Sequence, residues 1–192
     1  MQELKDRIIK EGKVLPGNII KVDGFLNHRV DTELMTHIAE EFGRYFNMDE
    51  VTVILTAEAS GIALSAIVAQ HFHKPMLFAK KAKSDNIEGG LYQSDIFSYT
   101  YKKKVTLLVA KDWLSADDKV LIIDDFMANG EAMRGLCDIV KAAGATLVGI
   151  GCAVEKGFQG GGDRLRAAGV NLKSLAVIES AEPGRIVFRE ET

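Results

Sequence analysis

The sequence predicts an α/β fold in which a mostly parallel central sheet is flanked by helices. Short runs of Val, Ile and Leu alternate with segments of helical periodicity, as happens where crossover helices join parallel strands. These runs are continuously apolar, which is typical of strands covered on both faces. The chain has 192 residues, 47% hydrophobic and 27% charged, and this predicts one domain over residues 1–192.

Six apolar runs are predicted as strands: residues 51–56, 76–79, 105–110, 120–124, 146–154 and 172–178. Helices are expected over residues 62–71, which Pro75 prevents from continuing, and over residues 130–143. Residues 2–46 indicate a short helix, an extended piece near residues 19–22 and a helix from about residue 32 to 46. We interpret residues 15–27 as a small cap beside the sheet.

Residues 80–104 break the rhythm of strands and helices. The segment is polar, basic at both ends and contains Gly89-Gly90. A stretch of this length between strands is usually a lid, a binding loop or a disordered segment. Residues 96–101 alternate within it like one arm of an antiparallel hairpin.

Composition excludes several classes of protein. The 24 basic and 27 acidic residues give a net charge of −3, which argues against a general nucleic-acid or membrane binder. No run of about 18 apolar residues is present, and the first residues lack the apolar core of a signal peptide. Cys137 and Cys152 are expected to be buried, reduced thiols, and the histidines lack metal-ligand spacing. We therefore expect a cytoplasmic protein without a metal site formed by its own side chains.

The most informative segment is VLIIDDFMANGEA, residues 120–132. An apolar run ends in Asp124 and Asp125, and a short loop with Asn129-Gly130 leads into a helix. In an open parallel sheet, ligands bind beyond the carboxyl ends of the strands, where loop N–H groups and a helix N-terminus can hold an anion. The pattern predicts carboxylates that hold sugar hydroxyls beside a phosphate loop. The alternative is the acid pair of a receiver domain or an ordinary strand end.

This segment resembles the motif that binds phosphoribosyl pyrophosphate (PRPP) in the type I phosphoribosyltransferases, and its ANGEA loop resembles the xanthine branch of the purine enzymes. The resemblance assigns ribose hydroxyls to the catalytic acids Asp124 and Asp125. The loop that would take the 5-phosphate consists of Ala128, Asn129, Gly130, Glu131 and Ala132. Most family members have Thr and Gly in this loop, so binding here would depend on backbone N–H groups. Glu131 is expected to point to solvent at the helix start.

Residues 56–62 resemble the pyrophosphate loop of the same family, which often holds a strained peptide. The match assigns pyrophosphate contacts to Ala59, Ser60 and Gly61, although a plain strand-to-helix turn explains the segment equally well. Residues 81–104 resemble the family's flexible flap, whose closure would exclude water from the reacting sugar. Its candidate contacts are Lys81, with Lys80 and Lys83, and the Ser98-Tyr99-Thr100 element. The lysines would otherwise form only a solvated face.

Residues 18–28 resemble the base-binding hood of the xanthine branch, and the hood spans about residues 1–30. Carried over, Ile20 packs on the purine and Asn27 reads its edge. The Asn27 amide can donate to the 2-oxo group of xanthine or accept from the 2-amino group of guanine. Lys156 ends a predicted strand, where its ammonium can donate to the 6-oxo group of a purine but faces a donor on adenine. Phe158 either walls the base or belongs to the core.

The resemblance spans nearly the whole chain and implies transfer of 5-phosphoribosyl from PRPP to xanthine, as in purine salvage. It also implies Mg²⁺ bound through PRPP and a homodimer, with no nucleic-acid or membrane partner. Transfer to guanine or hypoxanthine is the first alternative. A non-catalytic PRPP-binding regulator of purine genes is the second, but such proteins carry an extra DNA-binding domain.

Residues 160–163 (GGGD) are interpreted as a turn in which Asp163 caps a helix.

Overall fold

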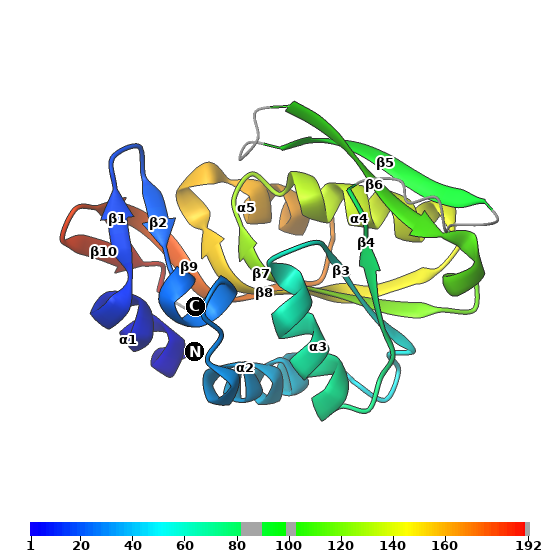
Figure 1. Ribbon diagram of the computed structural model, residues 1–192, viewed down its shortest axis with the longest axis horizontal. Coiled ribbons are helices and arrows are strands. Elements are labelled where there is room, and N and C mark those ends of the chain that lie inside the picture. Colours follow the sequence, from blue (N-terminus) through cyan, green and yellow to red (C-terminus); the bar gives the residue numbers. More distant parts are fainter. Residues whose placement is uncertain (82–89, 99–102, 191–192) are drawn as a thin grey trace.

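A computed structural model describes residues 1–81, 90–98 and 103–190 of the chain. Its centre is a six-stranded sheet in the order β10-β9-β8-β7-β3-β4 (Figure 1). The strands are β3 (Val53–Ala57), β4 (Met76–Ala79), β7 (Lys119–Met127), β8 (Thr146–Lys156), β9 (Leu172–Glu182) and β10 (Arg185–Phe188). All neighbours pair in parallel except β10, which is antiparallel to β9. The predicted mostly parallel α/β sheet is confirmed.

Helices cover both faces of the sheet (Figure 1). α2 (Thr32–Tyr45) and α3 (Gly61–His71) lie on one face, and α4 (Glu131–Ala142) and α5 (Gly161–Ala167) lie on the other. Successive residues of β7 alternate between the two cores: Leu121 and Ile123 belong to one hydrophobic cluster and Ile122 to the other. Because both faces are buried, the central strands are continuously apolar.

The prediction of residues 105–110 as a strand of the central sheet is wrong. This run lies in β6 (Lys103–Ala110), which pairs with β5 (Leu91–Ser98) in a separate antiparallel sheet. Ile96 and Leu107 are buried against Gly135 of α4, where a Cβ would come within 2.5 Å of the Ile96 side chain. Leu108 is also buried, beside the bridge to Lys80. The run is therefore apolar on both faces without belonging to the central sheet.

The expected hairpin arm at residues 96–101 is present in part, because β5 includes residues 96–98. Other parts of the predicted flap, with Lys83, Tyr99 and Thr100, lie outside the described residues. Within the central sheet, β7, β8 and β9 each run a few residues past the predicted strand ends. β10, which the apolar pattern did not reveal, follows a turn at Gly184 with φ +81°.

The N-terminal cap is a hairpin of β1 (Lys13–Leu15) and β2 (Ile19–Lys21) followed by one π-helical turn, η1 (Asp23–Asn27). Phe25 and Leu26 of this turn are buried, which fixes the position of the Asn27 backbone beside the sheet. α1 (Gln2–Glu11) buries Leu4 and Ile8 beneath the cap. The cap therefore stands at the end of the sheet where β7 and β8 terminate (Figure 1).

The 3₁₀ turn η2 (Lys111–Trp113) follows β6, and its Trp113 is 72% exposed. Two expectations about single residues need correction. Asp163 does not cap α5, which begins two residues earlier with Gly160 at the N-cap, and its carboxylate pairs with Arg189 at 2.7 Å. Cys152 is buried as expected, but Cys137 is only half-buried. None of the described helices is long and apolar enough to cross a membrane.

Candidate functional site

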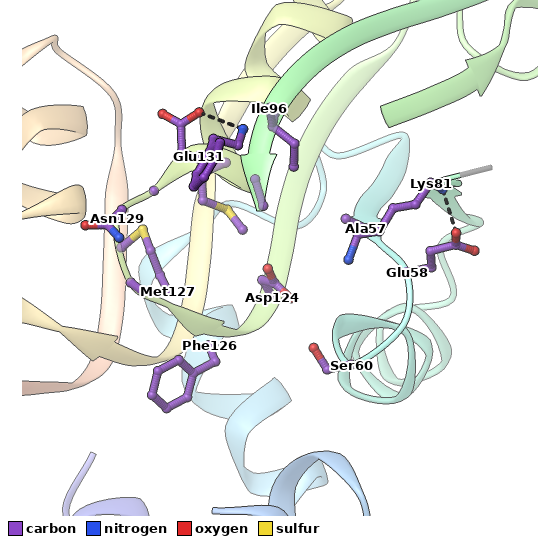
Figure 2. A pocket seen from close by; sticks show the side chains of 15 residues that line it. Ala57, Glu58, Ser60, Lys81, Ile96, Asp124, Phe126, Met127, Asn129 and Glu131 are labelled. Carbon is purple, nitrogen blue, oxygen red and sulfur yellow. Dashed lines mark hydrogen bonds between the residues drawn. The ribbon is translucent and has the colours of Figure 1, made fainter. Parts of the chain in front are cut away.

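A cavity of about 200 Å³ lies where the carboxyl ends of β3 and β7 meet (Figure 2). Its lining comes from the ends of these strands and the segments that follow them, from the residue Lys81 after β4, and from β5: Ala57, Glu58, Ser60, Lys81, Ile96, Phe97, Asp124, Phe126, Met127, Ala128, Asn129, Gly130, Glu131, Ala132 and Met133. The predicted phosphate loop and one predicted catalytic acid therefore share a cavity wall. Figure 2 shows Asp124 between the two loops, with Glu58 and Lys81 on one side and Asn129 on the other.

The acid pair is buried although it carries two carboxyl groups. Asp124 is 6% exposed and Asp125 only 1%. Burial raises the pKa of Asp124 well above its ordinary value, and the neighbouring charge of Asp125 raises it further. The Asp124 Oδ1 accepts the Asp125 backbone N–H at 3.0 Å. Asp125 Oδ2 accepts from the Asn27 side chain at 2.8 Å, whereas its buried Oδ1 has no hydrogen-bond partner among the described residues.

The 128–132 loop offers unpaired donors. Gly130 occupies the left-handed region, with φ +76°, and forms the N-cap of α4. Within the described part of the chain, the backbone N–H groups of residues 129–132 donate to no acceptor. Four free N–H groups at a helix N-terminus form a site suited to an anion such as a phosphate.

Contrary to expectation, the Glu131 side chain does not point freely to solvent. Its carboxylate accepts the Phe97 backbone N–H at 3.3 Å and pairs with Arg134 at 3.2 Å. The hydrogen bond from Arg134 is the main cause that lowers the pKa of Glu131. The negative charge in the loop is therefore compensated from α4 and β5, which reduces its repulsion of a bound phosphate.

The loop after β3 forms the opposite wall. Its Glu58–Ala59 peptide bond is cis. The Glu58 carboxylate accepts the Lys81 backbone N–H at 2.5 Å, so this loop is joined to the start of the predicted flap (Figure 2). Ser60 lines the cavity, and Ala59 and Lys81 line an adjoining one. The structure thus places all four predicted pyrophosphate contacts, Ala59, Ser60, Gly61 and Lys81, on one side of Asp124.

Gly61 is required by its neighbours. A Cβ at this position would lie 2.3 Å from Asp124 Oδ1 and 2.3 Å from Thr56 Oγ1. Both side chains are buried and short, so neither can move aside cheaply. The glycine therefore permits close contact between the first turn of α3 and the acid pair.

Replacing Gly61 with Ala is expected to lower kcat/KM by roughly 100-fold, because the new methyl group displaces the Asp124 carboxylate. Gly24→Ala is the matched control, since nothing lies within 4 Å of the Cβ that would be added there. Steady-state kinetics of both variants would be compared with the wild type. A Gly61→Ala protein with full activity would contradict this account of the site.

Two of the three predicted purine contacts, Asn27 and Lys156, lie beside the cavity. The Lys156 Nζ donates to the Asn18 carbonyl at 3.1 Å and lies 5.4 Å from the Phe126 ring, which lines the cavity. Desolvation lowers the pKa of Lys156. Asn27 reaches the acid pair, whereas Ile20 is buried in the hydrophobic cluster of the cap. The structure therefore brings Asn27 and Lys156 to the cavity edge, and it places Ile20 behind them.

Sequence reasoning missed several residues at this site. Phe126 directly follows the acid pair and lines the cavity, and its place inside the motif was the signal for this position. Phe158, the aromatic residue considered instead, packs against the core. Thr56 and Glu58 lie within the predicted pyrophosphate loop, but the sequence did not reveal the packing of Thr56 against Gly61 or the bond from Lys81 to Glu58. The described residues contain no group of three or more His, Cys, Asp or Glu that could hold a metal ion.

Comparison with known proteins gives consistent results. Residues 26–167 match the family profile described as "Phosphoribosyl transferase domain". The chain is 53% identical over 191 residues to a protein of Lachnoclostridium phytofermentans named xanthine phosphoribosyltransferase, with 98% of each chain covered. It is 52% identical over 192 residues to a protein of that name from Bifidobacterium longum, which covers 98% of this chain and 100% of the relative.

Solved structures support the fold. The adenine phosphoribosyltransferase of Giardia lamblia, solved with 9-deazaadenine, superposes with a TM-score of 0.76 at 20% identity, covering 90% of this chain and 96% of that one. The Saccharomyces cerevisiae adenine phosphoribosyltransferase gives a TM-score of 0.74 at 16% identity, with 91% and 99% covered. At such identities the likeness concerns the fold alone.

Proposed function

The chain belongs to the phosphoribosyltransferase family, and from this premise we propose that it transfers the 5-phosphoribosyl group of PRPP to xanthine. The products are xanthosine 5′-monophosphate and pyrophosphate, as in purine salvage. One observation supports this most directly: a buried acid pair stands beside four unpaired backbone N–H groups, with a lysine donor at the cavity edge. The relatives named xanthine phosphoribosyltransferase support the choice of base.

In the reaction, the bond from the sugar C1 to pyrophosphate breaks and a bond to a purine ring nitrogen forms, while the purine loses a proton. The N–H groups of the 128–132 loop hold the 5-phosphate. The unpartnered Asp125 Oδ1 accepts a ribose hydroxyl beside it. These fixed contacts align the sugar with the incoming base, so catalysis rests on positioning and on charge stabilisation.

The pyrophosphate leaves on the side of the loop after β3. Ala59, Ser60 and Gly61 lie there, next to the positive charge of Lys81. Residues on the two sides of Asp124 thus bind the two ends of PRPP. Asp124 and Asp125 would help to hold a Mg²⁺ ion bound through PRPP, because Mg²⁺ prefers substrate phosphates, carboxylates and water. Neither acid has a basic side-chain hydrogen-bond partner among the described residues. When bound, the ion would neutralise charge on the leaving pyrophosphate.

Purine selection comes from the cap and β8. The Lys156 ammonium donates to the 6-oxo group, which adenine lacks, and Phe126 beside it offers a ring face to the base. Asn27 reads the 2-position once its amide is released from Asp125.

We also propose that the protein works as a homodimer in the cytoplasm. Light scattering coupled to size exclusion tests the first point, and fractionation of the source cells tests the second.

The test of function is pyrophosphate release with PRPP and Mg²⁺, using xanthine, guanine, hypoxanthine and adenine in parallel. Turnover is expected with xanthine at a kcat/KM at least about tenfold above the other oxopurines and at least about 10⁴-fold above adenine. Preference for guanine or hypoxanthine would retain the PRPP site and overturn the assignment of the base. Failure with every base would overturn the enzymatic proposal.

A further inference from the structure

The glycine-rich segment at residues 160–162 packs directly against the 128–132 loop. A Cβ on Gly161 would lie 2.4 Å from the Ala128 carbonyl oxygen and 2.6 Å from the backbone of Asn129 and Gly130. A Cβ on Gly130 would in turn lie 3.3 Å from the Gly161 Cα. Only a residue without a side chain permits this approach. The segment therefore supports the loop from a position outside the cavity lining.

Arg164 of α5 holds the same loop by a hydrogen bond. Its Nη2 donates to the Asn129 carbonyl oxygen at 3.0 Å, and its Nη1 lies 3.4 Å from the Gln159 carbonyl oxygen. In a trans peptide unit the C=O and the following N–H point in opposite directions. A carbonyl of Asn129 fixed toward α5 therefore directs the Gly130 N–H to the opposite side, where no described residue accepts it.

α5 is itself anchored to the sheet by a buried ion pair. The Glu155 carboxylate is fully buried and bonds Arg166 at 2.6 and 3.1 Å and the Ser174 hydroxyl at 2.5 Å. Gly162 leaves room for that carboxylate, since a Cβ there would lie 2.1 Å from it. Glu155 of β8 is paired with Met127, the last residue of β7 before the loop. The loop is thus held within a closed ring of contacts that runs from β7 through α5 to β8.

The charge of Arg164 also reaches the loop. The pKa of Glu131 is lowered chiefly by the hydrogen bond from Arg134, and the positive charge of Arg164 lowers it further. A guanidinium behind the loop therefore adds a field that favours a bound anion.

We propose that Arg164 is a positioning residue for the 5-phosphate site, acting through the Asn129 peptide and supported by the close packing of Gly161. The inference rests on the proposed function in that the anion is the 5-phosphate of PRPP. It adds that α5, none of whose residues line the cavity, sets the direction of the loop's Gly130 N–H group.

The experiment measures the dissociation constants of two probes by calorimetry: ribose 5-phosphate, and pyrophosphate with Mg²⁺. Arg164→Ala is expected to weaken ribose 5-phosphate binding about tenfold, because a charge-assisted hydrogen bond to the loop is lost. Pyrophosphate binding should change less than about twofold, since its site lies across Asp124. Arg164→Lys should recover part of the loss, because an ammonium can also donate to the Asn129 carbonyl.

Arg44→Ala is the matched control, because Arg44 is an exposed arginine whose ion-pair partner is Glu41 on α2, far from the loop. Thermal unfolding should show that every variant remains folded. Unchanged ribose 5-phosphate binding in Arg164→Ala, or an equal loss for both probes, overturns the inference. A wild type that binds ribose 5-phosphate but turns over no purine would instead count against the proposed function alone, and the effect of Arg164→Ala would still decide the inference.

Discussion

Replacing Asp124 with Asn is expected to lower kcat/KM by at least about 100-fold and yet to raise the unfolding temperature of the ligand-free protein. The loss of activity follows because the carboxylate faces the cavity between the two substrate loops. The gain in stability follows because the charged carboxylate is buried beside Asp125. An amide keeps the oxygen that accepts the Asp125 N–H and needs no desolvation of a charge.

The stability difference should depend on pH in a defined direction. The pKa of Asp124 is higher in the folded state than its ordinary value of 3.8, chiefly because of burial. As the pH rises above 3.8, the unfolded chain releases this proton before the folded protein does, so ionisation destabilises the wild type. Asn does not titrate. The advantage of Asp124→Asn is therefore smallest below about pH 4 and reaches its full value above the folded pKa.

Thermal unfolding of both proteins across this pH range, without Mg²⁺ or PRPP, measures the effect. A shift of about 2–4 °C corresponds to each kcal/mol of relieved desolvation in a chain of this size. Asp117→Asn is the control, because Asp117 is an exposed acid in the turn before β7. An Asp124→Asn protein that is less stable than the wild type at neutral pH would show that burial of the Asp124 carboxylate does not destabilise the folded protein.

The sequence was sufficient for those parts of the site that lie in one contiguous segment. Asp124, Asp125 and the loop to Ala132 follow one another, and the strand-to-helix connection alone fixes their position at the sheet edge. The parallel sheet was also predictable, because burial on both faces leaves a continuous apolar run. Local pattern and fold agree in these segments.

Contacts between distant segments could not be read in this way. Residues 105–110 are as apolar as a central strand because they pack against α4, and only their pairing with β5 shows that they belong to a hairpin. The turn at residues 160–162 appeared to be a flexible connection, although its glycines permit contact with the phosphate loop and with Glu155. The bond from Asn27 to Asp125 joins residues 98 positions apart. The hydrophobic periodicity of the sequence does not indicate contacts between residues so far apart.

Replacing Lys156 with Gln is expected to have the largest effect on the choice of base. The ammonium donates a charge-assisted hydrogen bond to a 6-oxo group, and its loss should lower kcat/KM for xanthine by roughly 100-fold. A Gln amide can also turn to accept a hydrogen bond from the 6-amino group of adenine. The wild-type lysine cannot, since it has no acceptor while protonated. The ratio of xanthine to adenine turnover should therefore fall by more than the xanthine rate alone.

The fold around Lys156 makes this a test of recognition and not of stability. Its ammonium donates to the Asn18 carbonyl, a contact that a Gln side chain can also make, and lies over the Phe126 ring. The strand beneath it is anchored by Glu155. Lys141→Gln, on the exposed end of α4, is the matched control. Pyrophosphate release would be measured with each base at saturating PRPP. If Lys156→Gln lowered turnover of all four purines by the same factor, Lys156 would act on the common sugar chemistry, and selection against adenine would have to come from Asn27 or the backbone of the cap.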